Sequence, residues 1–456
     1  MYELNDTICA IATPPGMGGV GVIRLSGPGA LSRAGAFLNP AAPLEKKRAL
    51  LFRKLAHPQS GEILDEALVL VMPGPHSYTG EDVVEFHLHG SPALLSHLIS
   101  LLTAQGLRLA DPGEFTYRAF RAGRLDLTQA EAVEQLVSAQ GEASRREALR
   151  HLTGGLAAFL EPVEEALKSL YLKIEARLEF SEDGIAPLDL PRFQKEVGEV
   201  QSQLAGLLQS YQQGKILKEG LSVALVGPPN VGKSSLLNRL LGVNRAIVTP
   251  QAGTTRDVIE GVFLLKGVPV RFFDTAGLRD SSDLVEAEGI RRSRQVLDEA
   301  DFIFWILDST RSEESFREWE RQKPPLGRTW FLFNKEDLAP AKAPWKNFPA
   351  IPAERCLSLS CQAPQGLDSL LQAMEGLIEV PGASEGVLLT SARHQKEVSQ
   401  ASAALTHLVG LIESGQPYEL WAEELKEAAL AIGRVRGRNL PASAFEEIFT
   451  KFCIGK

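Results

Sequence analysis

The sequence predicts a multidomain protein in which an α+β segment comes first and a helical region is interrupted by an α/β domain. Three changes in residue composition and pattern along the chain support this prediction. Residues 1–118 are rich in Gly and Pro and contain short β-like runs such as VGVIRLSG and DVVEFHLHG. Residues 119–214 and 381–456 are helical in character, whereas residues 215–380 alternate strand-like and helix-like runs. This alternation indicates a parallel sheet, and its position indicates a domain inserted between the halves of one helical domain.

The first helical stretch carries a regular apolar face, formed by Leu160, Val163, Leu167, Leu170, Tyr171, Ile174 and Leu178. This spacing places the side chains on one side of an α-helix. We expect a helix that packs in a bundle rather than one that binds a partner.

The composition excludes several classes of protein. The formal net charge of −9 argues against binding nucleic acid by bulk electrostatics, so an RNA substrate would need a local basic surface or a partner. The four cysteines form no C-x-x-C pair, which argues against a disulfide framework or a structural zinc site. The sequence has no signal peptide and no apolar stretch of transmembrane length, so we expect a cytoplasmic protein that does not enter a membrane.

The α/β segment opens with a phosphate-binding motif. Residues 221–240, LSVALVGPPNVGKSSLLNRL, read as an apolar strand, a Gly-rich turn and an amphipathic helix, and they satisfy G-x-x-x-x-G-K-[ST]. Glycines let backbone N–H groups wrap phosphates, and the helix N-terminus adds partial positive charge. We expect Lys233 to reach the β- and γ-phosphate oxygens and Ser234 to ligate Mg²⁺.

Later motifs select guanine as the base. RFFDTAG (271–277) ends a strand at Asp274, which is expected to hold Mg²⁺ through water. In FLFNKED (331–337), the Asp337 carboxylate can accept from N1 and N2 of guanine, groups that adenine lacks, with Asn334 at N7 and Lys335 along the ring. LSLSCQ (357–362) supplies a loop near guanine O6.

The residues expected to contact GTP come from five segments in chain order. They are Asn230, Val231, Gly232, Lys233, Ser234, Ser235, Thr249, Pro250, Gln251, Ala252, Gly253, Thr254, Thr255, Asp274, Thr275, Ala276, Gly277, Asn334, Lys335, Asp337, Ser360, Cys361 and Gln362.

This chain lacks a glutamine at the position where Ras-like proteins have the residue that orients the attacking water. Leu278 follows DTAG at the position of their glutamine, and an apolar side chain cannot position water. Glu286 is our candidate, with a solvated helix residue as the equally weighted alternative. The Asn230 carboxamide and the carbonyls of residues 244–257 can hold a monovalent cation against the phosphates. We therefore expect a chain that binds and hydrolyses GTP.

Further motifs run along the whole chain. They include NDTICAIATPPGMGGVGVIRLSG, SYTGEDVVEFHLHG, DPGEFTYRAFRAGRLDLTQAEAV, EARLEFSEDGI, GTTRD and DTAGLRDSSDLVE. The chain ends in Cys453-Ile454-Gly455-Lys456. With these motifs the sequence resembles the tRNA modification GTPase family MnmE, also called TrmE, whose C-terminal signature is Cys-[Ile/Leu/Val]-Gly-Lys.

This resemblance implies an N-terminal tetrahydrofolate-binding and dimerisation domain (1–118), a discontinuous helical domain (119–214 and 381–456) and an inserted Ras-like G domain (215–380). It implies a homodimer that acts on tRNA with the FAD-dependent partner MnmG (GidA) in a heterotetramer. The implied reaction adds an aminomethyl or carboxymethylaminomethyl group at C5 of the wobble uridine, U34. A 5-formyl- or 5,10-methylene-tetrahydrofolate supplies the carbon, and two G domains approach each other across K⁺.

The same resemblance assigns site residues by motif. Mg²⁺ would be bound by Ser234 and Thr255, and K⁺ by Asn230, Thr249, Gln251 and Thr254. Glu286 would orient water, with Arg279 in the same loop. The residues that fall where the family contacts folate are Arg24, Glu85, Arg124 and Lys456.

Cys453 is the candidate thiol for the modification chemistry. From local sequence alone, a buried small hydrophobe is an equally good interpretation, and the family motif favours the functional one.

Some positions depart from the family's usual pattern. Arg124 stands where many members have Lys, which keeps the charge but changes its geometry. Cys361 replaces the usual Ala of the guanine loop, where the backbone binds. Residues 433–438 read Gly-Arg-Val-Arg-Gly-Arg instead of a Glu-Ile-Thr-Gly stretch. These arginines are candidates for tRNA contact, and a solvated helix end is an equally good interpretation.

Two N-terminal patterns have competing interpretations. Gly16, Gly18 and Gly21 spell G-x-G-x-x-G, but a β-like run follows instead of a helix, so we reject dinucleotide binding. Glu85, His87 and His89 alternate along one predicted strand and would share a face. A metal site is disfavoured there, because no third strong ligand group lies in the same region.

Two other classes of GTPase compete with tRNA modification. A ribosome-assembly GTPase commonly carries an RNA-binding module such as KH, whereas this chain returns to helices after the α/β segment. A mechanical GTPase acting on membranes would need an amphipathic basic helix or a lipid motif, and neither is evident.

Overall fold

The computed structural model describes residues 4–179, 187–243, 259–274, 297–298, 300–310, 325–338, 351–363, 367–378 and 386–456. The chain forms two compact units. Unit 1 comprises Met1–Ser138, Ala148–Leu208 and Ala392–Lys456, and unit 2 comprises Ala139–Glu147 and Gln209–Ser391. The domain boundaries expected from the sequence remain predictions.

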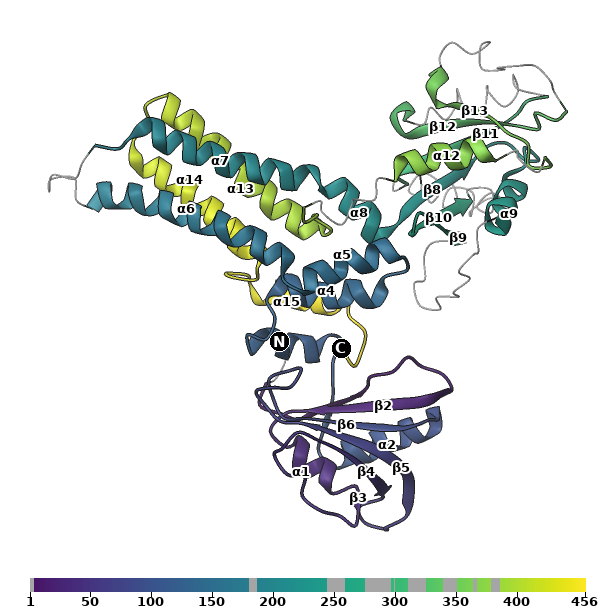
Figure 1. The fold of residues 1–456 in the computed structure, drawn as a ribbon, viewed down its shortest axis with the longest axis vertical. Coiled ribbons are helices and arrows are strands. Elements are labelled where there is room, and N and C mark those ends of the chain that lie inside the picture. Colours follow the sequence, from purple (N-terminus) through teal and green to yellow (C-terminus); the bar gives the residue numbers. More distant parts are fainter. Residues whose placement is uncertain are drawn as a thin grey trace, which may run out of the picture. The chain divides into compact units, whose positions relative to one another are not determined.

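Unit 1 begins with a seven-stranded sheet in the order β3-β4-β5-β6-β2-β1-β7 (Figure 1). Its strands are β1 Ile8–Ile11, β2 Gly18–Ser26, β3 Leu38–Asn39, β4 Ala49–Ala56, β5 Ile63–Met72, β6 Val83–Gly90 and β7 Arg108–Leu109. Helices α1 (Ala30–Gly35) and α2 (Pro92–Ala104) accompany it. Because side chains alternate between faces, Val84, Phe86 and Leu88 of β6 enter the core, and Glu85, His87 and His89 share the opposite face.

The run after Gly16 is confirmed as strand β2, not a helix, which agrees with the rejection of a dinucleotide site. Gly90 permits this pairing, because a Cβ there would lie 2.4 Å from O of Gly18 on the neighbouring strand.

Three helices lie where the C-terminal segment packs against the chain that follows the sheet. They are α3 (Glu114–Arg121), α4 (Leu127–Ser138) and α15 (Ala442–Phe449). Tyr117 of α3 packs edge-on against Phe449 of α15, with ring centroids 5.2 Å apart. Gly113, at φ +71°, lies so close to this segment that a Cβ would meet O of Phe449 at 2.6 Å. The C-terminal segment is therefore packed against the start of α3.

The remaining helices of unit 1 form a bundle made of α6 (Gly155–Glu179), α7 (Leu190–Gln209), α13 (Ala392–Glu413) and α14 (Tyr418–Val435). Helix α5 (Glu142–Leu152) precedes α6. The predicted apolar face is confirmed, since Leu160, Val163, Leu167, Leu170 and Ile174 are all buried. Phe193 of α7 stacks on Trp421 of α14 at 6.0 Å.

Unit 2 contains a six-stranded sheet in the order β13-β12-β11-β8-β10-β9. Only β9 and β10 pair in antiparallel fashion; the other pairs are parallel. In chain order the elements are α8 Tyr211–Glu219, β8 Leu221–Val226, α9 Lys233–Val243, β9 Ile259–Leu265, β10 Val268–Asp274, β11 Phe302–Asp308, β12 Thr329–Asn334, β13 Cys356–Ser358 and α12 Asp368–Leu377. The predicted fold class, with an α+β segment, a split helical domain and an α/β domain with a mainly parallel sheet, is confirmed.

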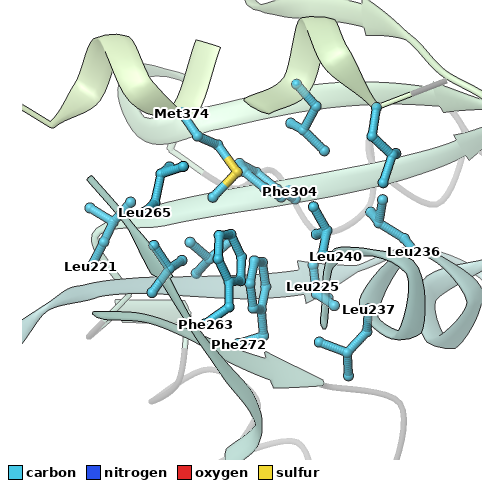
Figure 2. Packing of buried hydrophobic residues seen from close by; sticks show 14 of the residues in the cluster. Leu221, Leu225, Leu236, Leu237, Leu240, Phe263, Leu265, Phe272, Phe304 and Met374 are labelled. Carbon is cyan, nitrogen blue, oxygen red and sulfur yellow. The ribbon is translucent and has the colours of Figure 1, made fainter. Parts of the chain in front are cut away.

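The larger hydrophobic core of unit 2 lies between this sheet and helices α9 and α12 (Figure 2), and a second buried cluster surrounds Trp305 of β11. Leu236, Leu237 and Leu240 of α9 are buried against it. Phe263 and Phe272 stack across β9 and β10 with centroids 5.7 Å apart. This packing fixes α9, and with it the turn that precedes α9, relative to the ends of the parallel strands.

Candidate functional site

The turn between β8 and α9 requires backbone conformations and space that only glycine provides. Gly227 and Gly232 have φ values of +152° and +101°. A Cβ on Gly227 would lie 2.4 Å from O of Ile306, and one on Gly232 would lie 2.2 Å from Nδ2 of Asn334. No side chain fits at such distances. The two glycines of the motif therefore bring the turn against the ends of β11 and β12.

Lys233 begins α9, and its side chain lies back over this turn. Its Nζ donates to the carbonyl oxygens of Gly227 and Pro228, both at 2.9 Å, and the residue is buried. Ser234 and Ser235 follow and are exposed. An ammonium group and two hydroxyls thus lie at the positive end of a helix, where an anion is favoured. Asn230 is exposed in the same turn, at φ +63°.

Asn334, at the end of β12, joins this turn to the loop that follows β13. Its Nδ2 donates to O of Val231 at 2.8 Å, and its Oδ1 accepts from N of Cys361 at 3.3 Å. Asn334 is almost completely buried. One side chain therefore holds the phosphate-side turn and the predicted base-side loop together.

The predicted base-side loop is organised around Ser360. Its hydroxyl donates to Oδ1 of Asp337 at 2.5 Å and accepts from the backbone N–H groups of Gln362 and Ala363 at 3.2 Å each. Asp337 itself is exposed. Its carboxylate is thereby oriented while remaining accessible, which suits an acceptor for two adjacent donors.

Lys335 is held by Asp308, a residue that the sequence analysis did not select. Lys335 Nζ lies 2.6 Å from Oδ2 of Asp308, and Thr310 donates to Oδ1 through its N–H and hydroxyl at 2.9 and 2.6 Å. Desolvation opposes ionisation of Asp308, but the hydrogen bonds from Lys335 and Thr310 outweigh it, so its pKa lies below the usual range. Asp308 is thus a carboxylate that fixes Lys335 beside the predicted base site.

A second missed residue is Arg239 of α9. Its guanidinium donates to O of Cys361 at 3.2 Å and to O of Ala363 at 2.6 Å. It lies nearly two turns into the helix, after the G-x-x-x-x-G-K-[ST] consensus, where no residue type is specified, so the motif gave it no role. Arg239 and Asn334 therefore hold the same loop through different backbone groups.

Several predicted residues lie outside the described part of the chain. They are Thr249, Pro250, Gln251, Ala252, Gly253, Thr254, Thr255, Thr275, Ala276, Gly277, Leu278, Arg279 and Glu286. Asp274 ends β10, where its backbone pairs in register with Leu225 of β8. The structure thus brings together the phosphate turn and the base-side residues, and the roles of the residues named here stay predictions.

In unit 1, Arg24 is the centre of the predicted folate residues. Its Nε lies 2.7 Å from Oε1 of Glu85, directly opposite on β6. The guanidinium lies 5.5 Å from the ring centroids of both Tyr78 and Phe115. Tyr78 and Phe115 lie within motifs of the sequence analysis, but no local pattern gave either ring a role beside Arg24.

The C-terminal tail reaches this group. Nη1 of Arg24 donates to O of Gly455 at 3.1 Å. Gly455, at φ +93°, packs so closely on β1 that a Cβ would lie 2.5 Å from O of Ile11. Lys456 follows, half-buried, and its N–H donates to O of Cys453 at 3.3 Å. Arg24, Glu85 and the tail that carries Lys456 are thereby brought together.

The other two predicted residues here are exposed. Arg124 lies beside Gly80, where a built Cβ would be 3.6 Å from Cγ of Arg124. Cys453 is exposed, which excludes the interpretation of a buried small hydrophobe.

A largely buried ionic network surrounds Arg118 on α3, the helix that also carries Phe115. Arg118 of α3 pairs with Asp6 at 2.6 Å, with Glu81 at 3.1 Å and with Glu114 at 2.9 Å. Desolvation alone would lower the pKa of Arg118. The surrounding carboxylates have the larger effect, so its pKa lies above the usual value. Breaking such a pair leaves an uncompensated buried charge, so this network fixes α3 against the sheet.

On the strand face with Glu85, His87 and His89, the side chains contact other polar residues of the sheet. Glu85 pairs with Arg24, while His89 Nδ1 lies 2.7 Å from Oδ1 of Asp65 on β5. Among the described residues no cluster of three or more His, Cys, Asp or Glu has a geometry that could hold a metal ion.

Comparison with known proteins decides the family. A model described as the MnmE helical domain matches residues 127–453, and one described as the GTP-binding protein TrmE N-terminus matches residues 7–124. A tRNA modification GTPase MnmE from Thermus thermophilus is 39% identical over 458 residues, with all of both chains covered. One from Koribacter versatilis is 40% identical over 461 residues with the same coverage.

The chain belongs to the MnmE family of tRNA modification GTPases. Among solved structures, the G domain of the T. maritima FeoB iron transporter is 26% identical and covers 35% of this chain and 99% of its own, but its TM-score of 0.27 is too low to support an argument. None of the described helices is long and apolar enough to cross a membrane.

In this MnmE family member, the arginines of residues 433–438 form ion pairs within unit 1. Arg434 pairs with Glu397 at 2.6 Å and with Glu427 at 3.0 Å. Arg436 pairs with Glu164 at 3.0 Å, and Arg438 pairs with the same carboxylate. These contacts connect α6, α13 and α14, so the arginines have a role within the bundle that neither interpretation of the sequence included.

Proposed function

We propose that this chain binds and hydrolyses GTP as one component of an enzyme that modifies C5 of the wobble uridine, U34, in tRNA. Family membership supports the role in tRNA modification. The observation that carries the nucleotide assignment is the pair formed by Asp337 and Ser360, because it presents an oriented, accessible carboxylate in the loop next to Asn334. A carboxylate in that position discriminates guanine, which offers two donors, from adenine, which offers none there.

The residues of the phosphate turn suit a nucleotide and Mg²⁺. Lys233 would release the carbonyls of Gly227 and Pro228 to reach the phosphate oxygens. The exposed Ser234 hydroxyl at the start of α9 is a suitable oxygen ligand for Mg²⁺, with Thr255 as its proposed second protein ligand. Bound Mg²⁺ would neutralise charge that develops on the phosphates.

For hydrolysis, Glu286 would orient the attacking water, with Arg279 in the same loop. Asn230, Thr249, Gln251 and Thr254 would hold K⁺. Asn230 supports this because it is exposed within the phosphate turn, at a left-handed backbone position. Glu286→Ala should keep GTP affinity and lose most turnover, as measured by steady-state hydrolysis. Turnover that survives would contradict the role of Glu286.

The N-terminal sheet and the C-terminal tail would bind the one-carbon donor, a 5-formyl- or 5,10-methylene-tetrahydrofolate. Arg24, Glu85, Arg124 and Lys456 would form this site. The meeting of Arg24, Glu85 and the tail supports the proposal. Cys453, exposed two residues before Gly455, would be the thiol of the modification chemistry, which adds an aminomethyl or carboxymethylaminomethyl group.

A homodimer is supported by the open face of the N-terminal sheet. Leu50 and Phe52 of β4 and Leu68 of β5 are 63%, 61% and 43% exposed, and Phe52 and Leu68 pair directly across the two strands. Adjacent exposed apolar side chains of this kind mark an interface. The FAD-dependent protein MnmG (GidA) would be the further partner, in a heterotetramer, and tRNA the substrate.

GTP turnover in matched KCl and NaCl, at two protein concentrations, tests the proposed function. Stimulation by K⁺ that rises with protein concentration is the expected result, since it requires both the cation and the approach of two G domains. Turnover indifferent to the cation and to concentration would leave a GTPase but contradict the cation-dependent cycle. Tight binding to ribosomal subunits without folate would favour a ribosome-assembly GTPase instead.

A further inference from the structure

His87 extends the polar group around Arg24 by one residue. On β6 it lies two positions after Glu85 and on the same face of the sheet. Its Nε2 lies 3.1 Å from Oε2 of Glu85, while Oε1 of Glu85 lies 2.7 Å from Nε of Arg24. The two oxygens of one carboxylate are therefore held by two different side chains.

The residues paired directly with His87 across the strands offer its ring no polar side chain. Across the strands its direct neighbours are Val22 of β2 and Leu68 of β5, both apolar. Glu85, in contrast, is 8% exposed and has Arg24 and Leu70 opposite it. A buried carboxylate that lost a hydrogen-bond donor would bear the cost of desolvation without compensation. The contact of His87 Nε2 thus compensates part of the desolvation of the Glu85 carboxylate.

We propose that His87 is a positioning residue that fixes the Glu85 carboxylate for a tetrahydrofolate, an inference that rests on the proposed folate site. A carboxylate has about four lone-pair positions, and Arg24 and His87 occupy one on each oxygen. The remaining positions would accept hydrogen bonds from the ligand. The pterin ring of a folate carries an N–H and an amino group side by side, which match two oxygens held in this way.

Arg24 alone does not fix this orientation. A single Nε contact leaves the carboxylate free to rotate about its last bond, since that torsion is broad. A second donor on the other oxygen removes this freedom. His87 therefore acts through Glu85, and we expect no contact between its ring and the reacting carbon.

The test measures binding of 5-formyltetrahydrofolate by calorimetry to the full chain and to three variants. In His87→Gln an amide N–H lies near the position of Nε2, whereas in His87→Asn the amide ends one bond short of it. His89→Ala is the matched control, because His89 lies on the same strand face, is exposed and contacts Asp65 rather than Glu85. The thermal unfolding transition, followed by circular dichroism, reports whether each variant is folded.

We expect His87→Asn to weaken folate binding about five- to tenfold, the loss of one hydrogen bond to a charged group. His87→Gln should stay within about twofold of the unchanged chain, and His89→Ala should bind like it. Equal affinity in all variants, or an equal loss in the Gln and Asn variants, would overturn the role of His87 while leaving the folate site intact. No binding by the unchanged chain would overturn the folate site and this inference with it.

Discussion

The nucleotide site of unit 2 and the Arg24 group of unit 1 hold polar side chains in different ways. In unit 2, Asn334 ends β12 and Lys335 and Asp337 follow it, and all three are held by residues at or after the ends of other strands of the same sheet. In unit 1, Arg24 is held by Glu85, 61 residues away, and by the backbone of Gly455, 431 residues away. The first site depends on a single sheet, whereas the second depends on the C-terminal tail docking on β1. Variants should therefore act locally in unit 2 and at long range in unit 1.

The largest effect is expected from Gly232→Ala. Its Cβ would lie 2.2 Å from Nδ2 of Asn334, in a backbone conformation at φ +101° that disfavours side chains. Displacing Asn334 breaks the join between turn and loop, so GTP affinity should fall by about 100-fold. Titration with a fluorescent guanine nucleotide measures this.

Gly242→Ala is the matched control for that variant. Gly242 lies on the exposed side of α9 with nothing within 4 Å of a built Cβ. It should bind GTP normally and gain up to about 1 kcal/mol of helix stability. Normal GTP affinity in Gly232→Ala would contradict a rigid join at Asn334.

Arg24→Ala should have the next largest effect, on folate alone. It removes the partner of Glu85, the contact to Gly455 and the packing between Tyr78 and Phe115. We expect folate affinity to fall by about 30-fold and GTP turnover to stay unchanged. Arg24→Lys should recover only part of the loss, because an ammonium cannot make the same planar contacts. A parallel loss of GTP turnover would show that the two sites are not separate.

Gly455→Ala tests the long-range part of the comparison. Its Cβ would lie 2.5 Å from O of Ile11, so the tail should undock from β1 and Arg24 should lose an acceptor. Folate affinity should fall by about tenfold. Gly410→Ala, on helix α13 with nothing near its Cβ, is the control. Unchanged folate binding in Gly455→Ala would mean that the tail does not help to form the site.

Asp308→Asn should have the smallest effect, because it weakens one ion pair at the edge of the base site. We expect GTP affinity to fall by about threefold. The pKa of Asp308 is lowered in the folded chain, so its contribution is present above the unfolded pKa and is lost only as pH falls through the folded one. GTP affinity between pH 6 and pH 8 should therefore show no titration of Asp308, and a titration there would contradict the ion pair.

The sequence predicted the motifs of unit 2 because each lies at the end of a strand, so local pattern determines position. It predicted the fold class for a similar reason, from apolar periodicity. Asp308 and Arg239 were not predicted as site residues, since their roles depend on which strand and loop lie beside them. In unit 1 the resemblance identified Arg24 and Glu85, but Tyr78, Phe115 and the backbone of Gly455 are brought together only by tertiary packing. The ion pairs of Arg434, Arg436 and Arg438 likewise depend on helix contacts that no local pattern reveals.

The most direct test of the account is the nucleotide specificity of Asp337→Asn. The account assigns base selection to the Asp337 carboxylate, which accepts from N1 and N2 of guanine. An amide in its place can donate to a carbonyl at position 2, the group that xanthine carries instead of the amino group. We predict that the unchanged chain hydrolyses GTP and not ATP or XTP, and that Asp337→Asn loses GTP and gains XTP. Retained GTP turnover in this variant, with no gain of XTP, would contradict the assignment of the base site.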